Sequence, residues 1–230
     1  MFFPFYYDPT WIILLPALIL SLWAQARVNS TFNKYSKVNN RFGYTGADAA
    51  RRILDMNGLY NVRIERVGGN LTDHFDPKTN VVRLSDATYA SHSVGAIGVA
   101  AHEVGHAIQH ATGYSPIRFR NAIVPVVNIC NILSMPILLL GLFLSYTLVE
   151  FGIILFSATV MFQLVTLPVE FNASTRALRT LESQNMLAPD ELKGASKVLK
   201  AAAMTYVAAA VSSILSLLRL ILVFGGNRRD

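Results

Sequence analysis

Two histidines and a glutamate at helical spacing are the residues of this sequence best suited to chemistry. His102, Glu103 and His106 stand in the segment Ala101-His102-Glu103-Val104-Gly105-His106. On a helix, positions i and i+4 share one face one turn apart, so both imidazoles can bind a single tetrahedral zinc ion. Glu103 projects at an adjacent angle, from where it can take a proton from zinc-bound water and deliver it to a leaving amine. The pattern therefore predicts zinc-dependent hydrolysis of peptide bonds.

Two histidines leave a zinc ion short of a third protein ligand. The candidates are His110, His74, His92 and an acidic residue later in the chain. His110 lies a further turn along the same helix, with no glycine turn before it, so we expect it to point past the metal. Glu170 is the better candidate, because it follows a long apolar segment on the membrane face that we expect the motif to share. Without a metal, Glu170 would be an ordinary solvated acid at the interface.

The elements that must position these residues are unusually apolar. Of the 230 residues, 53% are hydrophobic and 15% are charged, against about a quarter charged in typical soluble domains. The net charge of +6 accompanies apolar runs, and no nucleic-acid-binding signature is present, so anionic lipid is the expected partner and nucleic acid is not. Cys130 is the only cysteine, which excludes an intramolecular disulfide and a cysteine metal site, and we expect it to act as a small hydrophobe.

Four apolar segments are candidates for membrane helices. They are Trp11–Ala24, Ala122–Val149, Phe151–Pro168 and Met204–Phe224. The middle two are separated by Glu150 alone and predict a tight helical hairpin, which Pro125, Pro136 and Gly141 should kink without breaking. The fourth contains Arg219, and three interpretations stay open: the arginine snorkels to the interface, the segment lies along the membrane, or it packs on the other helices.

The distribution of basic residues predicts which polar regions share a membrane face. Twelve of the twenty Lys and Arg residues fall in 25–121 and five in 169–203, whereas the expected hairpin tip has none. The positive-inside bias therefore puts both regions in the cytoplasm. Two membrane crossings separate them, so they lie on one side and can build one site together.

Local patterns divide the first polar region into short elements. We expect a helix over Thr45–Asn57, strands over Val62–Val67 and Val81–Leu84, a further strand over Leu71–Phe75, and a helix that ends near Ala111. Either Ser91 or Ser93 is suited to cap this last helix, which carries the zinc motif.

Three segments of the sequence resemble the YugP-type membrane zinc metallopeptidases and, more distantly, HtpX and the CaaX prenyl proteases. They are Leu71-Thr72-Asp73-His74-Phe75-Asp76-Pro77, His102–His106 and Glu170–Ser174. The resemblance implies a gluzincin arrangement with one zinc ion, in which His102, His106 and Glu170 are ligands and Glu103 is the base. The distant relatives often have aspartate where this chain has Ser174. Asn172 or Ser174 is therefore a candidate to orient a zinc-binding histidine.

The same resemblance gives Leu71–Phe75 the place of the edge strand that binds substrate. An extended peptide can pair with such an edge through backbone hydrogen bonds. His74 could then stabilise the oxyanion, with Arg176 and Arg179 as rival electrophiles, or it could be an ordinary polar residue of a hairpin. Lys193, Lys197 and Lys200 have helical spacing, and we expect them to face water or lipid headgroups.

Together these features predict a mainly α membrane protein, with a small α+β zincin-like domain and three or four transmembrane helices. The expected division is an N-terminal transmembrane anchor (1–24), a cytoplasmic zincin-like domain (25–121), a transmembrane helical hairpin (122–168), a cytoplasmic helical segment that supplies the third zinc ligand (169–203) and a C-terminal transmembrane or membrane-associated helix (204–230). We expect a multi-pass protein of the cell membrane with its active site on the cytoplasmic side.

The expected activity is endopeptidase cleavage of membrane or membrane-proximal proteins, with polypeptide substrates and the lipid bilayer as partners. A regulator or a homo-oligomer is left open. An intramembrane site-2-type protease is one alternative, but that class uses a Leu-Asp-Gly aspartate and this chain has no such tripeptide. A non-catalytic scaffold that binds zinc is the other. Glu103 argues against the scaffold, because a structural zinc site needs no base.

Overall fold

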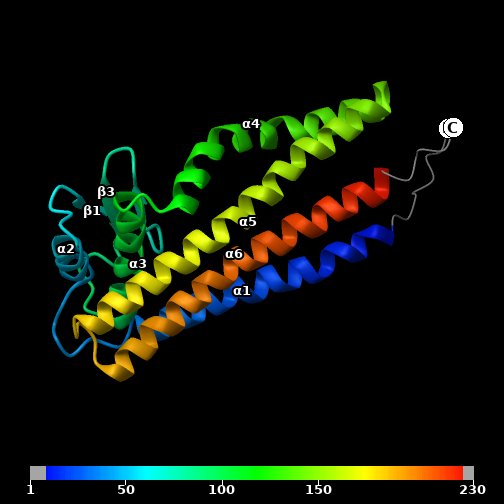
Figure 1. The fold of residues 1–230 in the computed structure, drawn as a ribbon. Helices are drawn as coiled ribbons and strands as arrows, with labels where there is room; N and C mark the ends of the chain where they lie inside the picture. The colour runs from blue at the N-terminus through cyan, green and yellow to red at the C-terminus, as the bar shows by residue number, and fades with distance from the viewer. Residues whose placement is uncertain (1–8, 225–230) are drawn as a thin grey trace.

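The computed structural model describes residues 9–224 as one bundle of long helices with a small α/β unit at one end (Figure 1). The elements are η1 (Pro9–Leu14), α1 (Leu15–Tyr35), α2 (Gly46–Met56), β1 (Arg63–Val67), β2 (His74–Asp76), β3 (Val81–Ser85), α3 (Val94–Ala111), α4 (Ser115–Leu144), α5 (Tyr146–Ser183) and α6 (Pro189–Phe224). Helices α4, α5, α6 and α1 lie side by side, while α2, α3 and the strands gather at the end where α5 finishes and α6 begins. This arrangement confirms the predicted mainly α class.

Four of the described helices are long and apolar enough to cross a membrane. They span Pro9–Tyr35, Ser115–Leu144, Tyr146–Ser183 and Pro189–Phe224. At most 17% of the most apolar stretch of each helix is buried within the molecule, so most of its side chains are at least partly exposed. An apolar surface of that extent is stable when lipid covers it. The C-terminal apolar segment thus belongs with the other three, and Arg219 packs over the Trp11 ring, 4.1 Å from its centroid.

The hairpin between α4 and α5 turns at Ser145, and the expectation of a turn at Glu150 was wrong. Ser145 has an extended backbone (φ −168°), and its hydroxyl accepts a hydrogen bond from the amide of Thr147, which caps α5. Glutamate is a good helix former and no breaker stands beside it, so Glu150 lies inside α5. The two helices of the hairpin lie very close together at Gly141, where a Cβ would be only 2.6 Å from the backbone nitrogen of Val149.

Both prolines of α4 lie inside an unbroken helix, as predicted, and the helix is visibly bent (Figure 1). Pro168 likewise lies inside α5, which continues to Ser183. The polar stretch 169–203 is therefore built from the ends of α5 and α6 and the turn between them, and not from a separate helical piece. Glu170 consequently stands on the same continuous helix as the apolar segment before it.

The three strands form one sheet in the order β1-β3-β2, with β1 parallel and β2 antiparallel to β3. Strand β2 is thus an edge strand, but it begins at His74 and not at Leu71 as predicted. Leu71 has a positive φ of 54° and Gly69 one of 108°, so the backbone turns there and cannot run extended. Asp73 then anchors the segment, because its carboxylate accepts hydrogen bonds from the amide and the hydroxyl of Ser85.

Helix α3 runs through the core of the α/β unit, in contact with α2, α5 and α6. Of the two candidate caps, Ser93 is the one used, since its hydroxyl accepts from the amide of Ala96 at 3.1 Å. Thr45 and Asp48 form a capping box at the start of α2, within one residue of the predicted helix. The apolar faces of α2, β3 and α3 pack together, so α3 is held from several sides.

Candidate metal centre

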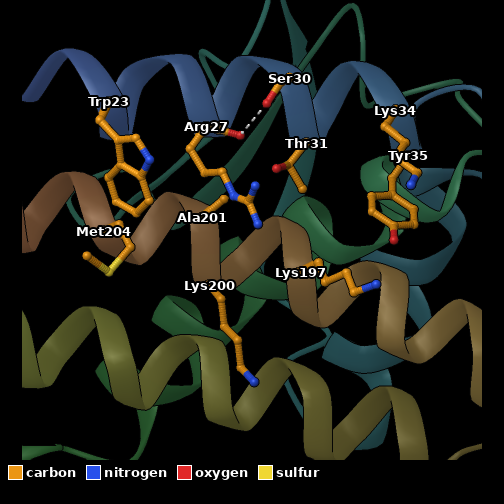
Figure 2. A pocket seen from close by; sticks show the side chains of 10 residues that line it. All are labelled: Trp23, Arg27, Ser30, Thr31, Lys34, Tyr35, Lys197, Lys200, Ala201 and Met204. Carbon is orange, nitrogen blue, oxygen red and sulfur yellow. Dashed lines mark hydrogen bonds between the residues drawn. The ribbon is translucent and has the colours of Figure 1, made fainter. Parts of the chain in front are cut away.

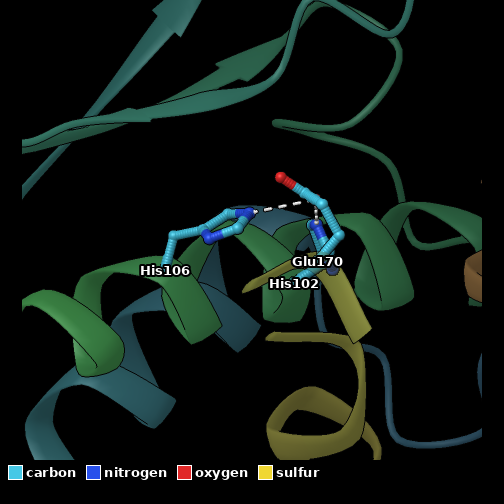
Figure 3. Close-up of side chains that lie close together, drawn as sticks. All are labelled: His102, His106 and Glu170. Atoms are coloured by element: carbon cyan, nitrogen blue, oxygen red, sulfur yellow. Dashed lines mark ion pairs between the residues drawn. The ribbon is translucent and has the colours of Figure 1, made fainter. Parts of the chain in front are cut away.

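The side chains of His102, His106 and Glu170 meet at one point between α3 and α5 (Figure 3). The Nε2 atoms of His102 and His106 lie 3.3 and 3.5 Å from Oε2 of Glu170. The two rings are nearly perpendicular, with centroids 4.8 Å apart. Within residues 9–224 this is the one group of three or more His, Cys, Asp or Glu side chains close enough to hold a metal ion.

A network around Gln109 decides which nitrogen of His106 faces Glu170. The Gln109 amide donates to the carbonyl of Val169 at 2.8 Å and to Oδ1 of Asn172 at 3.0 Å. Because the Val169 carbonyl can only accept, the other end of the amide is Oε1, which lies 3.0 Å from Nδ1 of His106. Nδ1 therefore carries the proton, and Nε2 presents a lone pair to Glu170.

His102 has a comparable partner on α5. The hydroxyl of Ser174 lies 3.1 Å from Nδ1 of His102 and can accept its proton, which leaves Nε2 as an acceptor. Of the two sequence candidates for orienting a histidine, Ser174 thus contacts His102 directly. Asn172 reaches His106 only through Gln109. Gln109 was missed by sequence reasoning, although it stands on the expected motif helix three residues after His106.

The close approach of α3 to α5 depends on Gly105, the residue between the glutamate and the second histidine of the motif. A Cβ at Gly105 would lie 2.8 Å from the carbonyl oxygen of Ala173, closer than real contacts allow. Glycine therefore lets the two backbones touch, and Glu170, one turn before Ala173, reaches the imidazoles. Figure 3 shows the result, with Glu170 leaning from α5 over both rings.

The electrostatics of the cluster favour a bound cation. Oε2 of Glu170 is buried and has no hydrogen-bond partner among the described residues, although two imidazole lone pairs face it. Three acceptors without a shared proton or cation repel one another, and a buried polar atom without a partner is costly. Burial opposes a charge on His106, but the carboxylates of Glu170 and Glu103 prevail and hold the pKa of His106 above its usual value. Two imidazoles and a carboxylate form a donor set that suits zinc.

Arg120 of α4 binds the other oxygen of Glu170, with its Nη1 atom 3.3 Å from Oε1. Its Nε is buried without a hydrogen-bond partner among the described residues. The sequence analysis included Arg120 only among the basic residues of 25–121 and gave it no role in the site. The signal available was weak, because basic residues at the ends of membrane helices are common.

Glu103 is buried and, with Glu170, lines two cavities beside the cluster. One, of about 170 Å³, has mostly apolar walls from α1, α3 and α6. The other, of about 180 Å³, opens between β2 and α4 and is lined by His74, His106 and Arg120. Tyr206 of α6 borders both cavities and was also missed, because a tyrosine at the start of an apolar segment is typical of any membrane interface.

The remaining sequence candidates lie outside the cluster. His74 is exposed on β2 at the rim of the second cavity, with Nδ1 2.9 Å from the carbonyl of Thr72. His110 is exposed and packs against Phe75, and His92 bonds to the carbonyl of Gly43, so the structure brings neither to Glu170. Neither arginine of α5 joins the cluster: Arg176 donates to Oδ1 of Asn172 and lies over the ring of Tyr114, and Arg179 is exposed.

Comparisons with known proteins show to which family the chain belongs. The chain belongs to the family described as "putative neutral zinc metallopeptidase", whose model matches residues 10–225. It is also similar to a protein of Bacillus subtilis (strain 168) named "Putative membrane protease YugP", with 53% identity over 218 residues, 94% of this chain and 96% of that protein. No solved structure matches the chain. The resemblance to the YugP-type family is thereby confirmed, and the chain is a multi-pass membrane protein of a zinc-peptidase family.

Proposed function

We propose that this protein is a membrane-embedded, zinc-dependent endopeptidase that cleaves membrane or membrane-proximal polypeptides. One observation carries the proposal: Nε2 of His102, Nε2 of His106 and the buried, unpartnered Oε2 of Glu170 face one another. We assign these three atoms as the ligands of one zinc ion per chain. Membership of a zinc-peptidase family supports the choice of metal.

Each residue of the site has a separate task in this proposal. Zinc held by these residues would supply a Lewis acid that activates water. Glu103, beside His102 on α3, takes a proton from the attacking water and delivers it to the leaving amine. Gln109 and Ser174 keep the protons of the histidines on Nδ1. Arg120 holds the second oxygen of Glu170, so that the first stays directed at the imidazoles.

The surroundings of the site suit an extended peptide with an apolar side chain. Strand β2 is an exposed sheet edge beside the second cavity, and its backbone can pair with a substrate strand. His74 on that strand is our candidate for stabilising the oxyanion. The first cavity, lined by Val28, Val99 and Leu199 among others, is apolar and about 170 Å³ in volume, whereas about 150 Å³ is enough for benzene. We propose that it receives an apolar side chain next to the scissile bond.

We further propose that the site faces the cytoplasm. Seventeen of the twenty basic residues lie in the two regions that form the α/β end of the bundle, which supports this orientation by the positive-inside rule. The division into an anchor (1–24), a catalytic domain (25–121), a hairpin (122–168), a ligand-bearing segment (169–203) and a last helix (204–230) stays part of the proposal.

Two variants test the proposal in one experiment. Purified full-length protein, loaded with zinc, is incubated with casein and with a model membrane protein, and its bound metal is measured. We expect Glu103→Gln to keep its zinc but lose cleavage by a factor of about 10²–10⁴, the usual contribution of a general base. Glu170→Ala should lose both zinc and cleavage.

The outcomes separate the parts of the proposal. Unchanged zinc content in Glu170→Ala would remove the third-ligand assignment. Cleavage that Glu103→Gln leaves intact would come from another protein or another site. Zinc binding without cleavage of any substrate would favour a non-catalytic scaffold.

A further inference from the structure

A groove of about 520 Å³ runs between α1 and α6, outside the candidate metal centre (Figure 2). None of its lining residues lines either cavity beside Glu103. The residues that line it are Trp23, Arg27, Ser30, Thr31, Lys34, Tyr35, Lys197, Lys200, Ala201 and Met204. The proposed peptidase chemistry makes no use of this groove.

The groove is cationic and its charges are not neutralised. Arg27, Lys34, Lys197 and Lys200 are exposed, and none of them forms an ion pair with any acidic residue in 9–224. Figure 2 shows the Arg27 side chain directed from α1 towards α6 near Ala201, whereas Lys200 points away from α1. Arg27 lines the groove from α1 and Lys197 lines it from α6, so changing this pair tests recognition from both helices.

The groove lies where both helices change from polar to apolar. The two helices are antiparallel neighbours, since Ser21 contacts Ser212 at 3.2 Å and a Cβ on Gly194 would touch the Tyr35 ring. The basic residues of α1 and α6 thus stand at one level. Trp23 and Met204 continue the groove on the apolar side, and tryptophan is the residue typical of that level of a bilayer.

We propose that this groove binds the headgroup of an anionic phospholipid, with the phosphate between Arg27 and Lys197. The hydroxyl of Thr31 lies beside Arg27 and can donate a further hydrogen bond to the phosphate (Figure 2). An acyl chain leaving the headgroup would continue along Trp23 and Met204. Polar and apolar parts of the groove follow the order of the parts of a phospholipid, which a free anion would not require.

The test uses full-length protein in nanodiscs of phosphatidylcholine mixed with phosphatidylglycerol. Native mass spectrometry measures the fraction of released protein that retains each lipid. We expect the wild type to retain phosphatidylglycerol preferentially and R27Q/K197Q to lose retention by about 25-fold, because each of the two basic groups near an anionic lipid contributes about a factor of five. The matched control K37Q/K193Q removes the same charge from exposed lysines outside the groove and should behave as the wild type.

Further arms separate the remaining explanations. R27K/K197R keeps both charges and should retain the lipid, whereas a loss there would contradict recognition by charge. Equal losses of phosphatidylglycerol retention in R27Q/K197Q and K37Q/K193Q would mean that basic residues attract the lipid wherever they lie on the surface. That result would overturn the groove as a specific binding site. Inorganic phosphate should not displace the lipid, because it lacks the acyl chains. Displacement by phosphate, or no preference for phosphatidylglycerol in the wild type, would overturn the lipid assignment.

Discussion

Gln109 is the residue through which α3 and α5 share one hydrogen-bond network at the metal centre. Its side chain is fully buried and joins His106 to the backbone of Val169 and to Asn172. A metal-binding histidine is usually oriented in this way by an acceptor on its other nitrogen. Here the acceptor is an amide, which also ties the helix of the histidines to the helix of Glu170.

Replacing this amide should weaken zinc binding without touching a proposed ligand. We expect Gln109→Leu to lower zinc affinity by about 10–100-fold, because Nδ1 of His106 loses its acceptor and the tautomer is no longer fixed. Competition with a zinc chelator measures the affinity. Gln184→Leu, at an exposed position after α5, is the control and should bind zinc as the wild type does. Equal affinities in all three proteins would mean that Gln109 has no role in orienting His106.

At the scale of elements, the contact of α3 with α5 sets the distance from Glu170 to the histidines. We expect Gly105→Ala to force the helices apart, because its Cβ would stand 2.8 Å from the carbonyl oxygen of Ala173. Overpacking of this kind costs about 1–3 kcal/mol of stability, and zinc affinity should fall as well. Gly98→Ala is the control, since it meets only Ala195 at 3.2 Å, away from the metal centre.

Thermal unfolding and zinc titration of the two glycine variants distinguish packing from metal binding. Gly98→Ala should lose some stability and keep its zinc affinity. Gly105→Ala should lose both. A Gly105→Ala protein with the zinc affinity of the wild type would show that the helices can separate without moving Glu170.

The hairpin of the edge strand carries a pH-dependent contribution to stability. Asp76 accepts hydrogen bonds from the hydroxyl of Thr79, from Arg83 and from the amide of Lys78, and together these hold its pKa below the usual value. A carboxylate with a lowered pKa in the folded state stabilises that state above its unfolded pKa of about 4, and the effect is lost as the pH falls through the folded value.

We therefore expect Asp76→Asn to lower the melting temperature at neutral pH. The difference from the wild type should be constant above about pH 5 and shrink steadily in more acidic solution, because protonation makes the wild-type side chain uncharged as well. Melting curves of both proteins across the acidic range measure it. A difference that widened on acidification would refute the assigned role of the carboxylate.

At the scale of the whole molecule, the two ends of the bundle should face opposite sides of the membrane. The turn at Gly69-Asn70 belongs to the α/β end, and the α4–α5 turn lies at the far end (Figure 1). In a Cys130→Ser background, a cysteine in place of exposed Asn70 should react with an impermeant maleimide in inverted vesicles. A cysteine in place of exposed Thr147 should react in right-side-out vesicles. The reverse pattern would refute the cytoplasmic orientation.

The sequence by itself determined the features that depend on local spacing and composition. The i, i+4 histidines, the apolar segments, the helix α2 and the cap of α3 follow from neighbours in the chain, and the structure has them at or near the predicted positions. The order of the apolar segments also made Glu170 the candidate third ligand, and the structure brings its Oε2 within 3.5 Å of both imidazoles, while its role as a ligand stays a prediction. Where prediction failed, as at the start of β2 and at the α4–α5 turn, backbone conformation at single residues decided the boundary.

Only the tertiary structure decided which atoms meet. Gln109 and Val169 are 60 positions apart, Arg120 and Glu170 are 50 apart, and no local pattern relates such pairs. Their contact depends on how closely two backbones approach, which is set by Gly105 against Ala173 and by the uninterrupted course of α5 through Pro168. The same packing buries Oε2 of Glu170 without a hydrogen-bond partner. A carboxylate attracts a cation strongly only where the surrounding helices exclude water, and helices far apart in the sequence create that environment here.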